Sequence, residues 1–172
     1  MPPIIRSRDS GVWGVFSIPG PSAKKRGFLM RFIFLQISFS PREGIAFPQN
    51  PVNTFRGALG FQLKRVACFQ RAQTACHTCL ARFDCAYALT FETSSLPGFE
   101  SLSSGGETAP HPVVFSSGFS GPAFFEREKR FSFRVSLFGK ATQILPHLVH
   151  ALREAANGGF TRRQVPCDLV GG

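Results

Sequence analysis

The sequence predicts a single α+β domain. The chain has 172 residues, enough to bury one substantial core. Hydrophobic residues make up 43% of it and charged residues 17%, which is typical of globular proteins and excludes a coiled coil or a wholly disordered chain. Segments with strand periodicity alternate with two segments of helical periodicity, as an α+β fold requires.

The first 29 residues are predicted to be a disordered leader. Residues 1–27 are rich in Pro, Gly, Ser and Arg, and they show neither helical nor strand periodicity. Met30 is followed at once by a strand-like run, so the sequence leaves open whether the biological start is Met1 or Met30. We therefore expect a leader over residues 1–29 and one folded domain over residues 30–172.

The folded domain is predicted to begin with a strand and a helix. Residues 31–39 are rich in Phe and Ile and are followed by a Ser-Pro pair, as expected for a largely buried strand. Apolar residues then recur at spacings of four and three, which is typical of one helix face. These residues are Phe55, Leu59, Leu63 and Val66. Asn53 or Thr54 is the predicted N-cap of this helix.

Two more strands, a second helix and a final strand complete the prediction. Residues 112–115 and the alternating residues 131–138 predict two strands. The second helix tolerates Pro146 in its first turn and ends at Asn-Gly-Gly over residues 157–159. Its apolar positions are Ile144, Leu145, Leu148, Leu152 and Ala155. Alternation over residues 165–169 predicts the last strand. The order is β-α-β-β-α-β, that of a single ferredoxin-like domain.

The chain is strongly basic. Its formal charge is +10 and its pI is about 10.3. This charge favours a polyanionic partner, because each Lys or Arg that neutralises a phosphate releases condensed counterions. A solvated basic surface is the alternative.

The aromatic residues are mostly phenylalanine. Phe contributes 20 residues, whereas Tyr and Trp contribute one each. Most of these rings are expected in the core, with base stacking as the alternative.

No segment has the pattern of a secretory signal or of a membrane-spanning helix. The longest apolar stretch, residues 28–39, is interrupted by Arg31 and Gln36 and is too short to cross a bilayer. We therefore expect a cytoplasmic protein without a membrane partner, in a compartment that keeps thiols reduced.

Four of the five cysteines are clustered. They are Cys68, Cys76, Cys79 and Cys85, whereas Cys167 stands apart. In a reducing compartment, clustered thiols indicate metal ligands before disulfides. Cys76 and Cys79 can bind one ion from a single turn, and the other two thiols complete a tetrahedral Cys₄ set. The sequence therefore predicts a structural zinc ion as a cofactor.

Such a zinc site would fix a cysteine-rich insertion, about residues 68–110, to the end of the first helix. Three alternatives stay open. The thiols could be reduced and partly buried without a metal, His77 could replace one cysteine, or the Cys-x-x-Cys pair could be redox-active. The last is disfavoured, because the pair does not lie between a strand and a helix N-terminus.

Several short motifs follow one another in a specific order. They are Phe55-Arg56-Gly57-Ala58-Leu59-Gly60, Leu63-Lys64-Arg65-Val66-Ala67-Cys68, Cys76-His77-Thr78-Cys79, Cys85-Ala86-Tyr87-Ala88-Leu89, Phe91-Glu92, His111-Pro112-Val113-Val114-Phe115, Leu137-Phe138-Gly139-Lys140-Ala141 and Leu145-Pro146-His147-Leu148. In this order, from about Met30 to the end, the chain resembles the CRISPR precursor-RNA processing endoribonucleases of the RAMP superfamily.

The resemblance implies binding of CRISPR repeat RNA and its cleavage without a catalytic metal, by attack of a ribose 2′-oxygen on the adjacent phosphate. It also implies possible contact with other CRISPR effector subunits. Relatives usually have two ferredoxin-like domains, and this chain resembles the first only. They often carry catalytic His, Tyr or Lys side chains in the region that corresponds to residues 40–65. In this chain, that region contains Lys64 but no His and no Tyr. No catalytic residue is assigned.

Five basic residues are predicted to contact RNA. They are Arg56, Lys64 and Arg65 on the first helix and Arg162 and Arg163 after the second. The Gly158-Gly159 turn lets backbone N–H groups and flanking guanidinium groups approach phosphates, although an ordinary helix stop is an alternative. The pair His147 and His150 shares one helix face and is expected at the surface.

Three functions are compatible with these features. The first is a CRISPR RNA endoribonuclease, active as a short form or represented by its first domain. The second is a non-catalytic RNA-binding subunit. The third is an inactive remnant of a disrupted endoribonuclease gene, whose lost second domain would leave apolar surface exposed.

Overall fold

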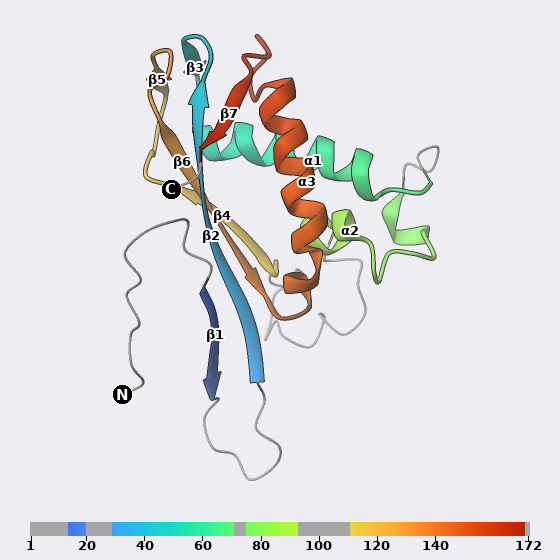
Figure 1. Cartoon of the computed structure of the whole chain (residues 1–172). Coiled ribbons are helices and arrows are strands. Elements are labelled where there is room, and N and C mark those ends of the chain that lie inside the picture. The colour runs from blue at the N-terminus through green and yellow to red at the C-terminus, as the bar shows by residue number, and fades with distance from the viewer. Residues whose placement is uncertain (1–13, 20–28, 71–74, 93–110, 171–172) are drawn as a thin grey trace.

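The computed structural model describes residues 14–19, 29–70, 75–92 and 111–170. The described elements form two layers, an antiparallel sheet and a set of helices that covers one of its faces (Figure 1). The predicted α+β class is confirmed. In this part of the chain, none of the helices combines the length and the apolar character needed to cross a membrane.

The main sheet has five strands. β2 (Leu29–Pro41) is the longest and pairs antiparallel with β6 (Phe131–Phe138), which pairs in turn with β4 (Val113–Ser117). Two strands share the other edge of β2: β1 (Gly14–Pro19) pairs with its first part and β7 (Cys167–Val170) with its last part. The sheet therefore runs from β7 through β2 and β6 to β4.

The alternation predicted for residues 131–138 is confirmed. Every second residue of β6 is buried: Phe131, Phe133, Val135 and Leu137. These residues face the helical layer because successive side chains of a strand point to opposite faces. The strand predicted at residues 31–39 is β2, which extends two residues beyond the prediction at each end.

A separate two-stranded ribbon was not predicted. It consists of β3 (Ile45–Phe47) and β5 (Ala123–Phe125), which pair antiparallel with Ile45 opposite Phe125. Each strand has only three residues, so its sequence is too short to show a periodicity.

Helix α1 (Pro51–Ala67) begins earlier than predicted. Its N-cap is Asn50, whose Oδ1 accepts a hydrogen bond of 3.0 Å from the N–H of Val52. The predicted caps Asn53 and Thr54 are therefore wrong. Pro51 explains the earlier start, because the first helical turn tolerates a residue without an N–H group. The predicted apolar face is confirmed at Phe55, Leu59 and Leu63, which are fully buried, while Val66 is half-buried.

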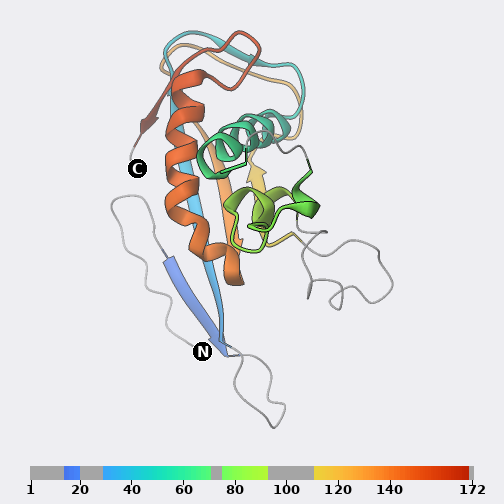
Figure 2. The ribbon, with the colours of Figure 1, turned by 90° about the vertical axis from the view of Figure 1, so that its right-hand side faces the viewer.

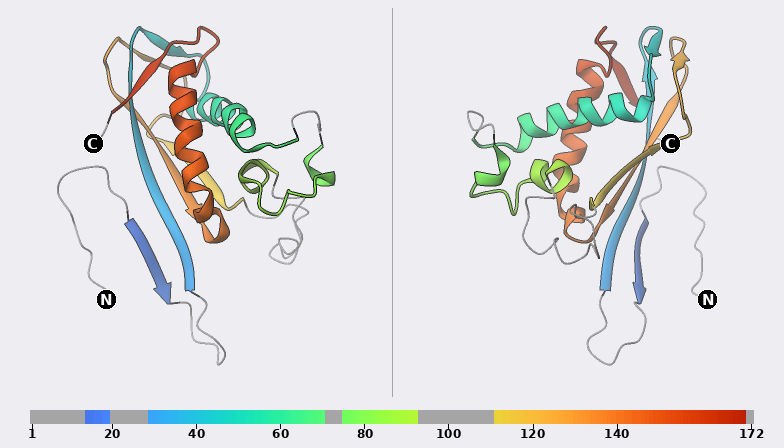
Figure 3. Two further views of the ribbon diagram at one scale, coloured as in Figure 1. Left: turned by 45° about the vertical axis from the view of Figure 1, so that its right-hand side comes forward. Right: turned by 180° about the vertical axis from the view of Figure 1, so that it is seen from behind.

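Helix α3 (Leu145–Gly158) follows the 3₁₀ segment η4 (Gly139–Ile144) and ends at the predicted glycines. Gly159 has a φ of 78°, and a Cβ atom there would lie 2.3 Å from the carbonyl carbon of Gln164. Only glycine fits this close backbone approach. Helices α1 and α3 pack on each other and on the same face of the sheet (Figures 2 and 3).

The core between the two layers is rich in phenylalanine. The rings of Phe55 on α1 and Phe133 on β6 stack with their centroids 4.2 Å apart. Phe39 on β2 packs edge-on against Phe160 at 4.8 Å. Such pairs contribute beyond the burial of their area, at roughly 0.5–1.5 kcal/mol each. Many of the rings thus belong to the core, as expected, although Phe61 and Phe69 are exposed.

The ends of the chain differ from prediction in two places. Within the expected leader, Gly14–Pro19 forms β1 and residue 29 opens β2; residues 1–13 and 20–28 lie outside the described residues. Pairing with the edge of β2, and not a side-chain period, defines β1. The last strand begins only at Cys167, because its pairing with β2 starts there, opposite Pro41. Val165 is buried ahead of the strand, and Leu169 is 41% exposed.

Candidate functional site

Among the described residues between α1 and β4 are two short helical segments. They are the 3₁₀ turn η1 (Cys76–Thr78) and helix α2 (Ala86–Phe91), which packs against α1. Lys140 of η4 holds this segment from the other side, because its Nζ donates to the carbonyl oxygen of Phe83 at 2.8 Å and lies 2.9 Å from Oδ1 of Asp84. Residues 93–110, the rest of the predicted insertion, lie outside the described residues.

An open groove of about 430 Å³ lies between α1 and α2. Its lining combines aromatic rings with polar side chains and glycines: Asn53, Arg56, Gly57, Gly60, Phe61, Tyr87 and Phe91. Gly60 permits the close approach of α2, since a Cβ atom there would lie 3.2 Å from Cζ of Phe91. Phe61 is 64% exposed, which leaves its ring accessible from solvent.

All three basic residues predicted on α1 lie over aromatic rings. Arg56 Cζ is 5.5 Å from the ring centroid of Phe91. Lys64 Nζ is 5.2 Å from that of Tyr87. Arg65 Cζ is 5.7 Å from that of Phe61 on the same helix. These distances are within the range of cation–π attraction, so the cations are held beside the groove.

Tyr87 is a candidate that the sequence reasoning missed. The family pattern places tyrosine within residues 40–65, but the fold brings the Tyr87 ring from α2 to Lys64 on α1. Burial raises the pKa of the Tyr87 hydroxyl, and the positive charge of Lys64 opposes the increase only in part. The hydroxyl is therefore protonated at neutral pH and is a possible hydrogen-bond donor.

The other predicted RNA-contacting residues lie elsewhere. Arg162 and Arg163 are exposed in the turn between α3 and β7, and neither lines the groove. The structure thus brings together three of the five predicted residues and not the other two. His147 and His150 are exposed on α3, as expected of a surface pair.

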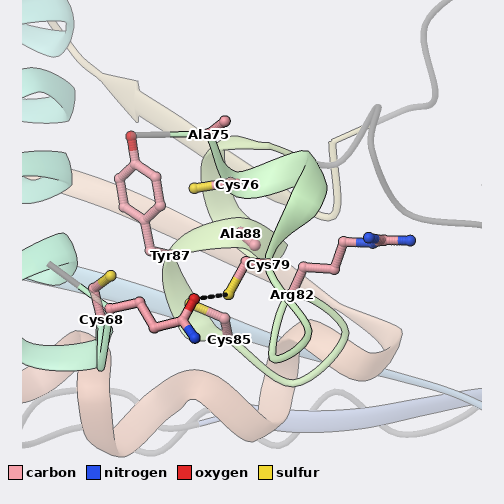
Figure 4. Close-up of a pocket in the computed structure, with 9 residues that line it drawn as sticks. Cys68, Ala75, Cys76, Cys79, Arg82, Cys85, Tyr87 and Ala88 are labelled. Carbon is pink, nitrogen blue, oxygen red and sulfur yellow. Dashed lines mark hydrogen bonds between the residues drawn. The ribbon is translucent and has the colours of Figure 1, made fainter. Parts of the chain in front are cut away.

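The four clustered cysteines line one small cavity beside the groove. Figure 4 shows the side chains of Cys68, Cys76, Cys79 and Cys85 around the same space. Its volume of about 20 Å³ is enough for a single water molecule or ion. Tyr87 lines both this cavity and the groove.

Each of these cysteines is half-buried and lies at the end of a helical segment. Cys68 is the C-cap of α1, Cys76 is the first residue of η1 and Cys79 its C-cap, and Cys85 is the N-cap of α2. The thiol of Cys79 donates a hydrogen bond of 3.6 Å to Oε1 of Gln70. Burial raises the pKa of the Cys76 thiol, and the negative charge of Glu92 adds to the increase.

In the part of the chain that the structure describes, no group of three or more His, Cys, Asp or Glu side chains is arranged so that it could hold a metal ion. The predicted zinc ion therefore stays a prediction. Cys167 is buried in β7, away from the cluster, and burial raises its pKa to about 11. A buried thiol with a raised pKa stays protonated at neutral pH and is a poor nucleophile.

Comparisons with known proteins give one match. Neither the curated proteins nor the solved structures compared with the chain match it significantly. A model of the AF_1859_N family, described as an N-terminal domain, matches residues 30–171. This range includes α1, the cysteine-lined cavity and every strand except β1. Because the match spans most of the sequence, the chain belongs to the AF_1859_N family of N-terminal domains.

Proposed function

We propose that this domain binds RNA with unpaired bases in the groove between α1 and α2. The observation that carries the proposal is a groove lined by three accessible or half-buried rings and by Arg56, with Lys64 over the Tyr87 ring beside it. Bases stack on aromatic side chains, at about 1–3 kcal/mol per base, while Lys and Arg attract the phosphates. Gly57 and Gly60 have no side chain, so the RNA backbone can approach helix α1 closely at these positions.

The resemblance to CRISPR precursor-RNA processing endoribonucleases supports a CRISPR repeat as the RNA. The motifs that carry the resemblance include residues 55–60 and 85–89, which contribute Arg56, Gly57, Gly60 and Tyr87 to the groove lining. The elements β2, α1, β4, β6, α3 and β7 follow in the order β-α-β-β-α-β, and their strands lie in the order β7-β2-β6-β4. This arrangement supports assignment to the ferredoxin-like class, with β1 and the β3–β5 ribbon as additions.

Binding can be tested with a fluorescent single-stranded RNA of CRISPR repeat sequence, titrated over a range of salt concentrations. The double variant Arg56→Ala/Lys64→Ala is expected to bind more weakly at low salt. The slope of log affinity against log salt should become shallower by about 1.4 if both cations contact phosphate, at about 0.7 per contact for single strands. The variant Arg153→Ala is the control, since it removes one exposed cation from α3. Equal affinity of the wild type and the double variant would exclude this groove.

Cleavage of the bound RNA is a second candidate function, favoured by the contact between Lys64 and Tyr87. A protonated hydroxyl beside a cation is suited to donate to the leaving oxygen while the cation stabilises the phosphate. The variant Tyr87→Phe keeps the ring and should bind RNA normally but cut it more slowly, in the presence of chelator. If the wild-type chain binds repeat RNA and leaves it intact, the domain is a non-catalytic RNA-binding subunit.

A further inference from the structure

We propose that Cys68, Cys76, Cys79 and Cys85 bind one zinc ion in a tetrahedral Cys₄ site, which joins α1, η1 and α2. The four thiols come from three separate segments and line a single cavity large enough for one ion. A set of four thiolates is typical of structural zinc sites, and soft sulfur ligands disfavour magnesium and calcium.

Cys76 and Cys79 supply the first pair of ligands from one tight turn. The N–H of Cys79 donates to the carbonyl oxygen of Cys76 at 3.1 Å, which closes the 3₁₀ turn η1. This backbone bond keeps the two thiols within reach of the same ion. The hydroxyl of Thr78 donates to the carbonyl oxygen of Ala75 at 3.1 Å and further stabilises the turn.

Cys68 and Cys85 supply the second pair from the helix ends beside the cavity. The N–H of Cys68 donates to the backbone carbonyl oxygen of Lys64 at 3.0 Å, and the N–H of Leu89 donates to the carbonyl oxygen of Cys85 at 3.0 Å. The backbones of Cys68 and Cys85 are thus fixed by helical hydrogen bonds. Their side chains lie at helix ends. A cysteine side chain changes the position of its sulfur by rotation about one bond. The four thiols as described are not arranged to hold an ion, so the proposal requires that their side chains rotate toward a common centre when the ion binds.

The surroundings favour a structural ion over a catalytic one. Ala75, Ala88 and Tyr87 form the apolar part of the cavity wall, and four protein ligands leave no open coordination position. Each thiol that binds releases its proton to solvent, so full loading releases the protons of four thiols. The exposed His77 does not line the cavity, which disfavours it as a substitute ligand.

The site would also fix the RNA groove, a consequence that rests on the proposed function. Tyr87 lines both spaces, so an ion that ties Cys85 at the start of α2 to Cys68 at the end of α1 holds both walls of the groove. RNA binding would then require the bound ion, whereas metal binding can be measured without RNA.

The experiment is a metal analysis of the purified full chain, followed by titration of the metal-free protein. We expect one zinc ion per chain, and a cobalt-substituted protein with the thiolate charge-transfer absorption of a tetrahedral site. The double variant Cys76→Ser/Cys79→Ser should lose the ion. The variant Cys167→Ala should keep it, because Cys167 lies outside the cavity.

Because a variant could simply fail to fold, the wild-type chain provides the second measurement. Zinc added to the reduced, metal-free chain should saturate at one equivalent, release protons and raise the melting temperature. Absence of zinc uptake by the reduced wild-type chain, or uptake that persists in the double cysteine variant, would overturn the proposal. Loss of RNA binding with normal zinc uptake would instead contradict the proposed function alone.

Discussion

The two sides of helix α1 have opposite physical characters. The side that faces the sheet carries Phe55, Leu59 and Leu63, which are fully buried. The side that faces α2 and solvent carries Arg56 and Lys64, both of which lie over rings of α2. One helix therefore stabilises the core with one side and forms the candidate binding groove with the other. Because one side packs in the core and the other faces the groove, we expect substitutions on the two sides to have separable effects.

The largest effect is expected on the buried side. Phe55→Ala removes a ring that is inaccessible to solvent and stacks on Phe133 at 4.2 Å. The change should lower the free energy of unfolding by about 3–5 kcal/mol, because it loses the burial of the ring and leaves a cavity. Urea unfolding followed by circular dichroism measures the difference.

Phe61→Ala is the matched substitution on the other side of the same helix. Its ring is 64% exposed, so the free energy of unfolding should change by no more than about 0.5 kcal/mol. RNA affinity should fall instead if the ring stacks on a base. Similar losses of stability at positions 55 and 61 would contradict the division of α1 into two sides.

A smaller effect is expected at two glycines of α1. Gly57→Ala should raise the free energy of unfolding by about 0.5–1 kcal/mol, because alanine favours a helix and a Cβ atom there meets nothing within 4 Å. Gly60→Ala should gain less, because its Cβ atom would meet the Phe91 ring at 3.2 Å. Thermal unfolding of both variants compares the two positions. Equal gains would indicate that α2 is not closely packed on α1.

The smallest effect is expected at the exposed ion pair between Arg42 and Asp168, which belongs to neither side of α1. The guanidinium lies 2.6 Å from the carboxylate and lowers the pKa of Asp168 below the ordinary 3.8. Because the folded-state pKa is lowered, the stabilisation is present above the ordinary pKa and is lost as the pH falls through the lowered one.

Asp168→Asn should therefore be slightly less stable than the wild type at neutral pH. The difference should disappear under acid conditions, where the wild-type carboxylate is protonated as well. Unfolding curves of both proteins across this pH range check the sign. A difference that grows on acidification would exclude the ion pair as its cause.

Much of the fold could be predicted because its main elements have a clear period. The alternation of β6 and the spacing of Phe55, Leu59 and Leu63 on α1 follow directly from which side chains face the core. The ribbon β3–β5 and strand β1 could not be found in this way, because backbone pairing with distant residues defines them. Pro51 does indicate the start of α1, because proline is favoured in the first helical turn, but the apolar period begins only at Phe55.

The candidate site was less predictable than the core. Basic residues on α1 could be chosen from the sequence, but their partners on α2 depend on how a six-residue helix packs. Tyr87 lies 23 residues after Lys64 in the sequence, and no periodicity connects the two positions. The proximity of the four cysteines was expected from their spacing, and all four do line one cavity.

The pairing of β2 has a consequence for synthesis on the ribosome. Phe32 pairs with Phe138, so the first half of β2 obtains its partner on β6 only after on the order of 100 further residues have been made. At roughly 5–20 residues per second, the apolar side chains of β2 wait several seconds before β6 and the helix α3 are made, although β1 is already present to pair with its first part. A nascent chain in this state is a substrate for chaperones that hold exposed apolar segments, and its yield in cells should depend on them.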